Sequence, residues 1–379
     1  MRGWGRQTRF HLPLSSPPSR RGKTMWIASR VGRHNPPLEP SPVVVNVMPS
    51  MEYKESCISK LFIGQPFIQH QINPHGFSFY LSWHQHFIMK VQTSAVALLS
   101  SWIPATYAWG ALGHETVAYI ATNFVSTATK SYFQGILGDT STDYLASVAT
   151  WSDSYRYTTA GKFSAPFHYI DAQDSPPTSC GVEYSRDCGS SGCVVSAIKN
   201  YTTILQKGTA SAANLDIAAK MIVHFVGDIH QPLHDENLDV GGNSISVTYA
   251  GATTNLHAVW DTAIPEQYVG GYSLADAKSW AATLTTAIKT GTYSSLKAGW
   301  TENIDIDDPV KSSMVWASDT NAYVCSTVLS DGVSAVESGD LSTNGYYTAA
   351  IPVVKLQIAK AGYRLAAWLD LIATGTTNL

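Results

Sequence analysis

Residues 220–234 read KMIVHFVGDIHQPLH and carry the strongest structural signal in the chain. Apolar residues recur at helical spacing over 213–230, which predicts a helix that ends before Pro232. Within this helix His224 and Asp228 are four residues apart, so their side chains lie on one face, one turn from each other. An imidazole and a carboxylate placed together in this way form a ligand pair suited to a divalent metal ion.

A second pair with the same spacing lies in NLHAVWD, where His257 precedes Asp261 by four residues. His234 follows the first pair, Asp153 lies in ATWSDSYRY, and His168 lies in HYIDAQD. The part of the chain that carries all of them contains only six histidines, so two such pairs are hard to explain as ordinary helix surfaces. Because imidazole and carboxylate ligands suit Zn²⁺, we expect these side chains to converge on a zinc site.

The chain divides by charge into a basic N-terminal part and an acidic remainder. Residues 1–108 contain eleven Lys and Arg against three Asp and Glu, a net charge of +8. Residues 109–379 contain fourteen against twenty-five, a net charge of −11. Hydrophobic residues make up 44% of the chain and charged residues 14%, which excludes a disordered or coiled-coil protein. The acidic remainder without a basic stripe argues against a module that binds duplex DNA.

The join between the two parts has the pattern of a secretory signal peptide. Met89 and Lys90 are followed by the apolar stretch VQTSAVALLSSWIPATYA, with small residues before a predicted cleavage site after Ala108. A buried core helix is the alternative interpretation. We therefore expect a signal peptide at 89–108, a non-native or disordered extension at 1–88, and a secreted, extracellular protein without a membrane anchor.

Residues 109–379 predict a single compact, monomeric domain of mainly α class. Gly-, Ser- and Thr-rich joins separate segments of helical spacing, and GGNSISVTYA predicts a short β-hairpin. The expected helices span 113–126, 193–206, 213–230, 273–290, 310–330 and 352–372. Charged residues interrupt the last one, which we interpret as a core helix with a solvent-exposed stripe. These residues are Lys355, Lys360, Arg364 and Asp370.

The domain contains an even number of cysteines, which fits two disulfides in an oxidising compartment with three possible pairings. They are Cys180, Cys188, Cys193 and Cys325, whereas Cys57 belongs to the N-terminal extension. Asn200 begins an N-glycosylation sequon, which fits a surface loop of a secreted protein. Cleavage after Ala108 would expose the amine of Trp109, which can chelate a metal with its own carbonyl oxygen, and His114 follows five residues on.

These motifs closely resemble those of the S1/P1 nucleases, the secreted zinc-dependent single-strand nucleases of fungi. The likeness runs from residue 109 to the C-terminus and rests on WGALGHETVAYIA, ATWSDSYRY, HYIDAQD, HFVGDIHQPLHDENLDVGGN, NLHAVWD and KAGYRLAAWLDLIA. It implies the fold shared by P1 nuclease and phospholipase C, built around a trinuclear zinc cluster. It also implies that Cys180 pairs with Cys325 and Cys188 with Cys193, and it gives no ligand role to His230, which we interpret as structural.

The resemblance assigns nine residues to three zinc ions. The first ion would be held by Asp153, His168, His224 and Asp228. The second would be held by His234, His257 and Asp261, with positions left open for water or substrate. The third would be held by Trp109, His114 and the shared Asp228. The zinc charge exceeds that of the three ligand carboxylates, so a phosphodiester can bind although the domain is acidic.

The implied reaction is hydrolysis of single-stranded DNA and RNA to 5′-phosphate products by a zinc-activated water, with 3′-nucleotides as further substrates. Asp153 would orient the nucleophile and Arg156 would stabilise charge in the transition state, unless Arg156 is a solvated surface arginine. Tyr169 would stack an unpaired base and Asp171 would accept its N–H groups. The same pocket would be lined by Gly241, Gly242 and Asn243. The alternative for Tyr169 is a core aromatic residue, and the alternative for residues 241–243 is a plain turn.

Two other functions compete with a nuclease. A zinc-dependent phospholipase C is the main alternative, because bacterial members resemble this fold and also use an N-terminal Trp and three zinc ions. They typically carry Glu in place of Asp261, and they lack the HYIDAQD stretch and both disulfides. A secreted zinc-sequestering protein with an inactive site is the second alternative, and the presence of both Asp153 and Arg156 argues against it.

Overall fold

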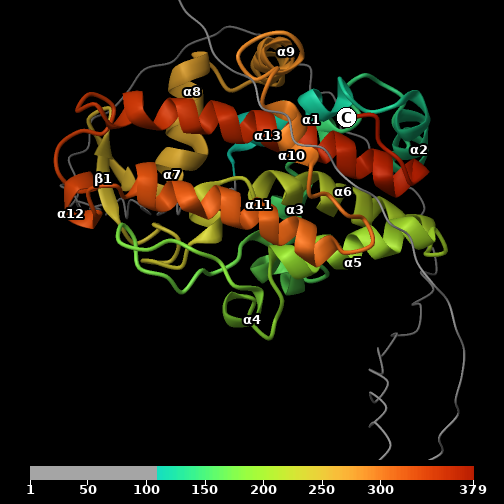
Figure 1. Ribbon diagram of the computed structural model, residues 1–379, viewed down its shortest axis with the longest axis horizontal. Helices are drawn as coiled ribbons and strands as arrows, with labels where there is room; N and C mark the ends of the chain where they lie inside the picture. The colour runs from blue at the N-terminus through green and yellow to red at the C-terminus, as the bar shows by residue number, and fades with distance from the viewer. Residues whose placement is uncertain (1–108) are drawn as a thin grey trace, which may run out of the picture. The chain divides into compact units, whose positions relative to one another are not determined.

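The long C-terminal helix α13 (Tyr346–Thr374) crosses the domain, and other helices pack along it (Figure 1). The computed structural model describes residues 109–379. Helix α1 (Ala111–Thr122) packs between α13 and α9 (Leu274–Lys289). Helix α6 (Ala212–Asp228) contacts both α13 and α1, so the segment that carries two predicted metal ligands lies inside the helical assembly.

The mainly α class and the single hairpin are confirmed, and each of the six expected helices is present. The remaining helices are α2 (Thr127–Leu137), α3 (Trp151–Tyr155), α4 (Tyr184–Asp187), α5 (Val194–Lys207), α7 (Leu256–Ala258), α8 (Ile264–Val269), α10 (Lys297–Thr301), α11 (Pro309–Tyr323) and α12 (Val333–Val336). Tight or wide helical turns occur at η1 (Ala146–Val148), η2 (Lys162–His168), η3 (Pro232–Asp235), η4 (Val259–Ala263) and η5 (Val324–Val328). The last helix starts earlier than predicted, at Tyr346, with Pro352 tolerated inside it.

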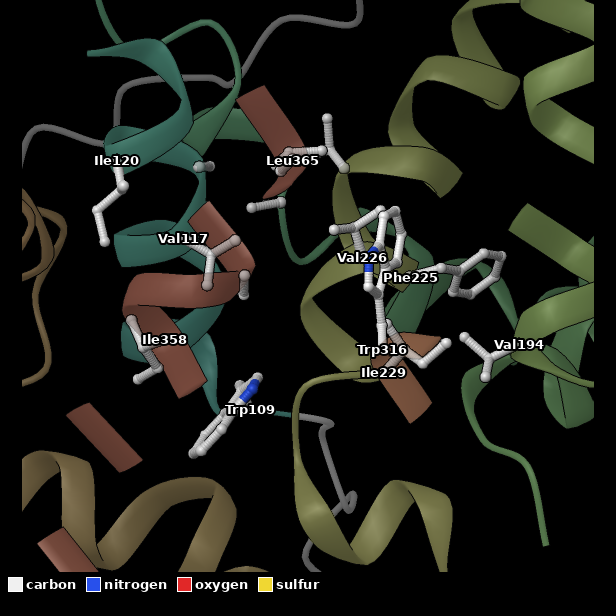
Figure 2. Packing of buried hydrophobic residues seen from close by; sticks show 14 of the residues in the cluster. Trp109, Val117, Ile120, Val194, Phe225, Val226, Ile229, Trp316, Ile358 and Leu365 are labelled. Atoms are coloured by element: carbon white, nitrogen blue, oxygen red, sulfur yellow. The ribbon is translucent and has the colours of Figure 1, made fainter. Parts of the chain in front are cut away.

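The apolar core forms where α1, α6, α11 and α13 meet (Figure 2). Its members share almost complete burial and come from widely separated segments. They include Val117, Ile120, Phe225, Ile229, Trp316, Ile358 and Leu365. Burying a large apolar side chain contributes about 1.5–3 kcal/mol, so this cluster can hold the helices that carry polar side chains in the interior.

The solvent-exposed stripe expected on α13 is wrong for three of its four residues, because Lys360, Arg364 and Asp370 are buried. Lys360 and Arg364 both form ion pairs with Asp319 of α11, at 2.7 and 3.1 Å. Arg364 also donates to Nε2 of His230, at 3.0 Å, while Nδ1 of that histidine faces a backbone carbonyl of α6. The charges are therefore satisfied inside the protein, and they tie α13 to the end of α6.

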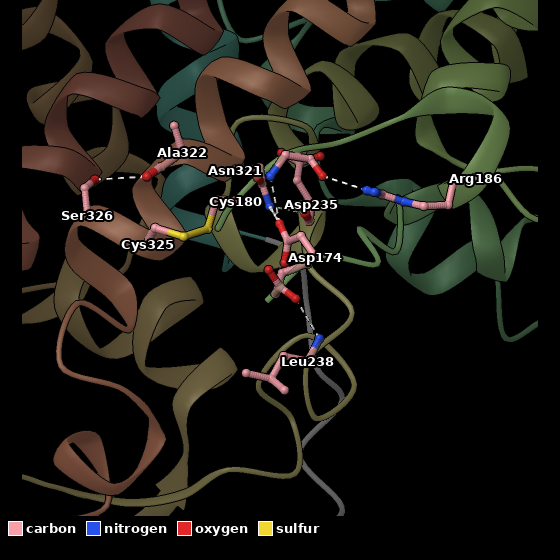
Figure 3. The surroundings of a disulfide bond; sticks show 11 residues. Asp174, Cys180, Arg186, Asp235, Leu238, Asn321, Ala322, Cys325 and Ser326 are labelled. Atoms are coloured by element: carbon pink, nitrogen blue, oxygen red, sulfur yellow. Dashed lines mark hydrogen bonds between the residues drawn. A yellow bond between two sulfur atoms is a disulfide. The ribbon is translucent and has the colours of Figure 1, made fainter. Parts of the chain in front are cut away.

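The two expected disulfides are confirmed as Cys180–Cys325 and Cys188–Cys193. The first joins residues 145 positions apart and anchors the turn η5 to the loop that follows Asp174 (Figure 3). Beside it, Asn321 of α11 donates to the carboxylate of Asp174 and to the backbone carbonyl of Asp235. This disulfide therefore braces the short turn η3, which carries His234.

The hairpin pairs β1 (Ser246–Tyr249) with β2 (Ala252–Asn255) through a two-residue turn in which Ala250 and Gly251 both have positive φ. The carboxylate of Asp340 accepts both turn N–H groups, at 3.0 and 2.7 Å, and the hydroxyl and N–H of Ser342. The hydrogen bonds from Ser342 and from the turn lower the pKa of Asp340 to about 2. Because β2 leads directly into α7, the hairpin fixes the start of the segment that carries His257.

Several expectations concern the surface or the N-terminal part of the chain. The extension at 1–88, with Cys57, and the signal peptide at 89–108 lie outside the described residues. Asn200 is exposed as its sequon requires, but it lies on α5 rather than in a loop. Between residues 109 and 379, the helices are all too short or too polar to cross a membrane.

We expect the two disulfides to differ in their contribution to stability. Loss of Cys180–Cys325 by a double Ala substitution should lower the free energy of unfolding by about 5 kcal/mol, because this bond closes the longer loop in the unfolded chain. The matched double substitution of Cys188 and Cys193 should cost about 2 kcal/mol. Denaturant unfolding of both variants measures the difference, and an equal or reversed order would contradict the expectation.

We also expect Asp340→Ala to destabilise the hairpin in a pH-dependent way. The pKa of Asp340 is depressed in the folded state, so its contribution is complete above the unfolded pKa of about 4 and is lost as pH falls towards 2. Comparing the denaturant midpoints of the native protein and the variant at pH 6 and near pH 2 measures this loss. A difference that stays constant over this range would refute the role of the ionised carboxylate.

Candidate metal centre

Eight of the nine predicted metal ligands converge in three groups of buried side chains. Within each group the candidate ligand atoms lie within 4.8 Å of one another. The groups are His114, His224 and Asp228; Asp153, His168 and His224; and His234, His257 and Asp261. The ninth predicted ligand, Trp109, is fully buried at the start of α1, and the N–H of the next residue donates to the backbone carbonyl of Asp261.

Asp228 stands at the centre of the first two groups. Its Oδ1 lies 3.2 Å from Nε2 of His114, whereas its Oδ2 lies 3.1 Å from Nδ1 of His168 and 3.3 Å from Nε2 of His224. The two oxygens of this one carboxylate therefore face different groups. This is the arrangement that the shared ligand role predicted for Asp228 requires.

Four segments deliver the ligands of these two groups. Helix α6 presents His224 and Asp228 one turn apart, as the spacing predicted, and α3 and η2 present Asp153 and His168. Helix α1 brings His114 so close to α6 that its ring stacks on His224, with centroids 4.0 Å apart. A Cβ at Gly227 would lie 2.7 Å from Nδ1 of His114, so this approach requires glycine.

The third group forms around a local widening of the helix that follows β2. His257 lies in α7 and Asp261 in the π-helical turn η4, and their side-chain atoms approach to 3.1 Å. His234, from η3, lies 3.9 Å from the same carboxylate. Gln231, which the sequence reasoning did not single out, donates to Asp261 from its buried side chain. This contact orients the carboxylate towards the two imidazoles.

Three of the histidines are oriented by backbone carbonyls on the far side of the ring. Nδ1 of His224 donates to Ala149, Nδ1 of His234 donates to His168, and Nδ1 of His257 donates to Gly241, at 2.6–2.7 Å. Because a carbonyl oxygen can only accept, each bond places a proton on Nδ1, so that the neutral ring turns the lone pair of Nε2 towards its group. Such outer hydrogen bonds are a regular feature of metal-binding histidines.

Burial and charge prepare the histidines for binding a cation. Burial lowers the pKa of His168 and of His234 to about 4, so both imidazoles are neutral near pH 7 and keep a lone pair for a metal. For His224 burial also lowers the pKa, but the carboxylates of Asp228 and Asp153 outweigh this effect and raise it to about 9. The carboxylates therefore attract positive charge into a site that excludes solvent.

The buried polar atoms of the centre fit metal ions as their missing partners. Buried polar groups are normally hydrogen-bonded, yet several ligand atoms here are buried without a hydrogen-bond partner. They are both ring nitrogens of His114, both oxygens of Asp153, Oδ1 of Asp228, Nε2 of His234 and Oδ2 of Asp261. His230 lies outside all three groups, in line with its structural interpretation.

The predicted substrate residues lie beside this centre. A guanidinium nitrogen of Arg156 lies 3.7 Å from Oδ1 of Asp153. Tyr169 directly follows His168 and is 38% exposed, which excludes a fully buried core aromatic. With Asp171 it lines a pocket of about 250 Å³ that is also lined by residues 189–193 of the small disulfide loop. Burial, followed by the charge of Asp187, raises the pKa of Asp171.

The glycines predicted for the base pocket have a different environment. Gly241 and Gly242 are buried and pack against Leu233 and His257. They do not line the pocket that contains Tyr169, and Gly241 instead orients a candidate metal ligand. The side-chain oxygen of Asn243 is buried without a hydrogen-bond partner among the described residues. A role in base binding for these three residues stays a prediction.

Comparison with known proteins places the chain in one family. The model of the S1/P1 nuclease family matches residues 109–374. The chain is 63% identical over 269 residues to Nuclease S1 from Aspergillus oryzae, which covers 71% of this chain and 93% of that protein. It is 51% identical over 264 residues to Nuclease P1 from Penicillium citrinum, which covers 70% of this chain and 97% of that protein. Endonuclease 2 from Arabidopsis thaliana is 34% identical over 312 residues, with coverage of 76% and 97%. The chain therefore belongs to the S1/P1 nuclease family, and the prediction that it is a nuclease of this type is confirmed.

Proposed function

We propose that this protein is a secreted endonuclease that hydrolyses single-stranded DNA and RNA to 5′-phosphate products and also removes phosphate from 3′-nucleotides. The observation that carries the proposal is the convergence of eight buried imidazole and carboxylate ligands directly beside Arg156 and Tyr169. Two disulfides and an exposed glycosylation sequon at Asn200 support export into an oxidising compartment.

Three zinc ions are the metal content that the donor set supports best. Imidazoles and carboxylates without a thiolate suit Zn²⁺, and the three groups together offer eight side chains, with His224 common to two of them. The terminal amine and carbonyl oxygen of Trp109 would complete the site of His114 and Asp228 after signal cleavage. The buried position of Trp109 at the start of α1, next to Asp261, supports this completion.

When bound, zinc supplies a water of lowered pKa as nucleophile and a positive charge for the departing 3′ oxygen. Asp153 has two buried oxygens, so one can ligate while the other accepts a hydrogen bond from the attacking water and orients it. Arg156, held next to Asp153, directs its planar N–H groups at the phosphoryl oxygens. Two residues three positions apart would thus orient the reacting groups: Asp153 lies in α3, and Arg156 directly follows this helix.

Selection for single strands follows from the pocket beside the metal centre. Tyr169 offers an exposed ring face on which any unpaired base can stack, and Asp171 offers oxygens that accept base N–H groups. A duplex keeps its bases stacked and paired, so it cannot fill this pocket. The domain carries a net charge of −11, so attraction of the strand is confined to the metal centre rather than spread over a basic surface.

The phospholipase C alternative has less support. HYIDAQD and both disulfides, which bacterial members lack, are present, and the relatives reported above are named nucleases or endonucleases. Parallel assays on single-stranded DNA and on phosphatidylcholine vesicles decide between the two. The nuclease proposal predicts turnover of the DNA, and turnover of the lipid alone would overturn it.

Removal of zinc should abolish activity and weaken the fold. We expect elemental analysis of the processed protein to find about three zinc ions per chain, and chelation to remove them together with hydrolysis of single-stranded DNA. The melting temperature should fall, because the buried carboxylates then lose their counter-charge. Readdition of Zn²⁺ should restore activity. Full activity after exhaustive chelation would contradict the proposed mechanism.

Replacement of Asp153 by Asn should lower kcat by about 10²–10⁴-fold, the range expected for loss of a group that orients the attacking water. The fold should be largely retained, which circular dichroism checks. Asp216→Asn, at a partly exposed position of α6, is a matched control and should keep normal kcat. Retention of full turnover by the Asp153 variant would remove the role assigned to this residue.

A further inference from the structure

One aromatic ring beside the metal centre has no role in the function described so far. Tyr157 follows Arg156 in the chain and is 66% exposed, which is unusual for a large aromatic side chain. The guanidinium carbon of Arg156 lies over its ring, 5.2 Å from the centroid. Within residues 109–379 no other aromatic ring pairs with Tyr157, whereas its neighbour Tyr155 stacks on Trp151. The exposed face of Tyr157 is therefore not used to build the core.

The backbone holds this ring in place although the ring is exposed. The N–H of Tyr157 donates to Ser154, and the N–H and hydroxyl of Thr158 both donate to the carbonyl of Tyr155. The turn closes through Gly161, whose N–H donates to Thr158. A Cβ at Gly161 would lie 2.1 Å from the carbonyl oxygen of Tyr155, so the tight turn requires glycine there. The ring is thus presented by a well-bonded turn, which lowers the entropy cost of using it for binding.

Arg156 connects this ring to the rest of the site. Its guanidinium contacts both the carboxylate of Asp153, at 3.7 Å, and the ring of Tyr157. The same oxygen of Asp153 lies 3.8 Å from Nδ1 of His168, which directly precedes Tyr169. Tyr157 is not among the residues that line the Tyr169 pocket. Two separate aromatic side chains, Tyr157 and Tyr169, therefore lie on either side of the pair formed by Asp153 and Arg156, where the proposed function places the scissile phosphate.

We propose that Tyr157 is a second stacking platform, which receives the base of the nucleotide on the 3′ side of the scissile phosphate. The inference rests on the proposed function, and it assigns to Tyr169 the base on the 5′ side, whose sugar supplies the departing 3′ oxygen. The phosphate held by Arg156 joins that nucleoside to the next one, so a single sugar separates this phosphate from the next base. The next base then lies within reach of the ring that the same arginine contacts.

An unpaired base fits this face better than a protein side chain or a lipid would. The face is a single ring next to a fixed cation, and the next group along a bound strand is a nucleobase that can stack without sequence preference. The base would lie on the ring face beside a guanidinium, which itself stacks on planar groups. Because a 3′-mononucleotide has no nucleotide on this side, the platform contributes to the binding of dinucleotides and longer strands only.

The test compares two substrates that differ by this one nucleotide. We expect Tyr157→Ala to lower the ratio of kcat/KM for the dinucleotide ApA to kcat/KM for adenosine 3′-monophosphate by about tenfold, mainly through KM for ApA. Tyr157→Phe keeps the ring face and should restore the ratio of the native protein. Tyr272→Ala, at a tyrosine that is 73% exposed, is the matched control and should leave the ratio unchanged.

Three results would overturn the inference. An unchanged ratio in Tyr157→Ala would show that the ring binds no base. An equal loss on both substrates would show that Tyr157 only supports Arg156. A low ratio in Tyr157→Phe would assign the effect to the hydroxyl rather than to stacking. In each case zinc-dependent hydrolysis by the native protein still tests the proposed function separately, so the two failures are distinguishable.

Discussion

The burial of three neighbouring carboxylates is the constraint on which the centre depends, because within residues 109–379 only one of them, Asp153, has an arginine or lysine partner, Arg156. Asp153, Asp228 and Asp261 are almost fully buried, and a buried charge is costly unless a counter-charge compensates it. The raised pKa of His224 shows how strongly Asp228 and Asp153 attract positive charge. In the proposed function divalent cations would meet this demand for the whole centre, which would couple metal binding to folding of the ligand-bearing helices.

The rest of the domain fixes the positions of the segments that carry the candidate ligands. The apolar core fixes α1 and α6 against α13, and the ion pairs of the buried Arg364 and Lys360 with the partly exposed Asp319 tie α13 to α11. The disulfide Cys180–Cys325 and the hairpin brace the segments that carry His234 and His257. In the proposed function the excess positive charge of the bound zinc ions would also attract the phosphate of a substrate, so stability and catalysis would share one electrostatic cause.

Regular spacing made much of this architecture predictable. The periodicity of α6 and the repeated four-residue interval between His and Asp identified both the helix that carries His224 and Asp228 and four of the candidate ligands. Features that depend on tertiary contact were not accessible in this way. A buried Arg364 has the same sequence pattern as a solvated one, α2 buries too narrow a stripe to stand out, and Gln231 and Gly227 matter only because of what folds against them.

The central claim is that the three groups of side chains bind three zinc ions, and anomalous diffraction tests it most directly. Crystals of the processed protein, measured on both sides of the zinc absorption edge, should show three strong peaks among His114, Asp153, His168, His224, Asp228, His234, His257 and Asp261. Each peak should lie about 2.0–2.2 Å from its nitrogen and oxygen ligands. Zinc peaks elsewhere, or none within this cluster in zinc-replete crystals, would contradict the account.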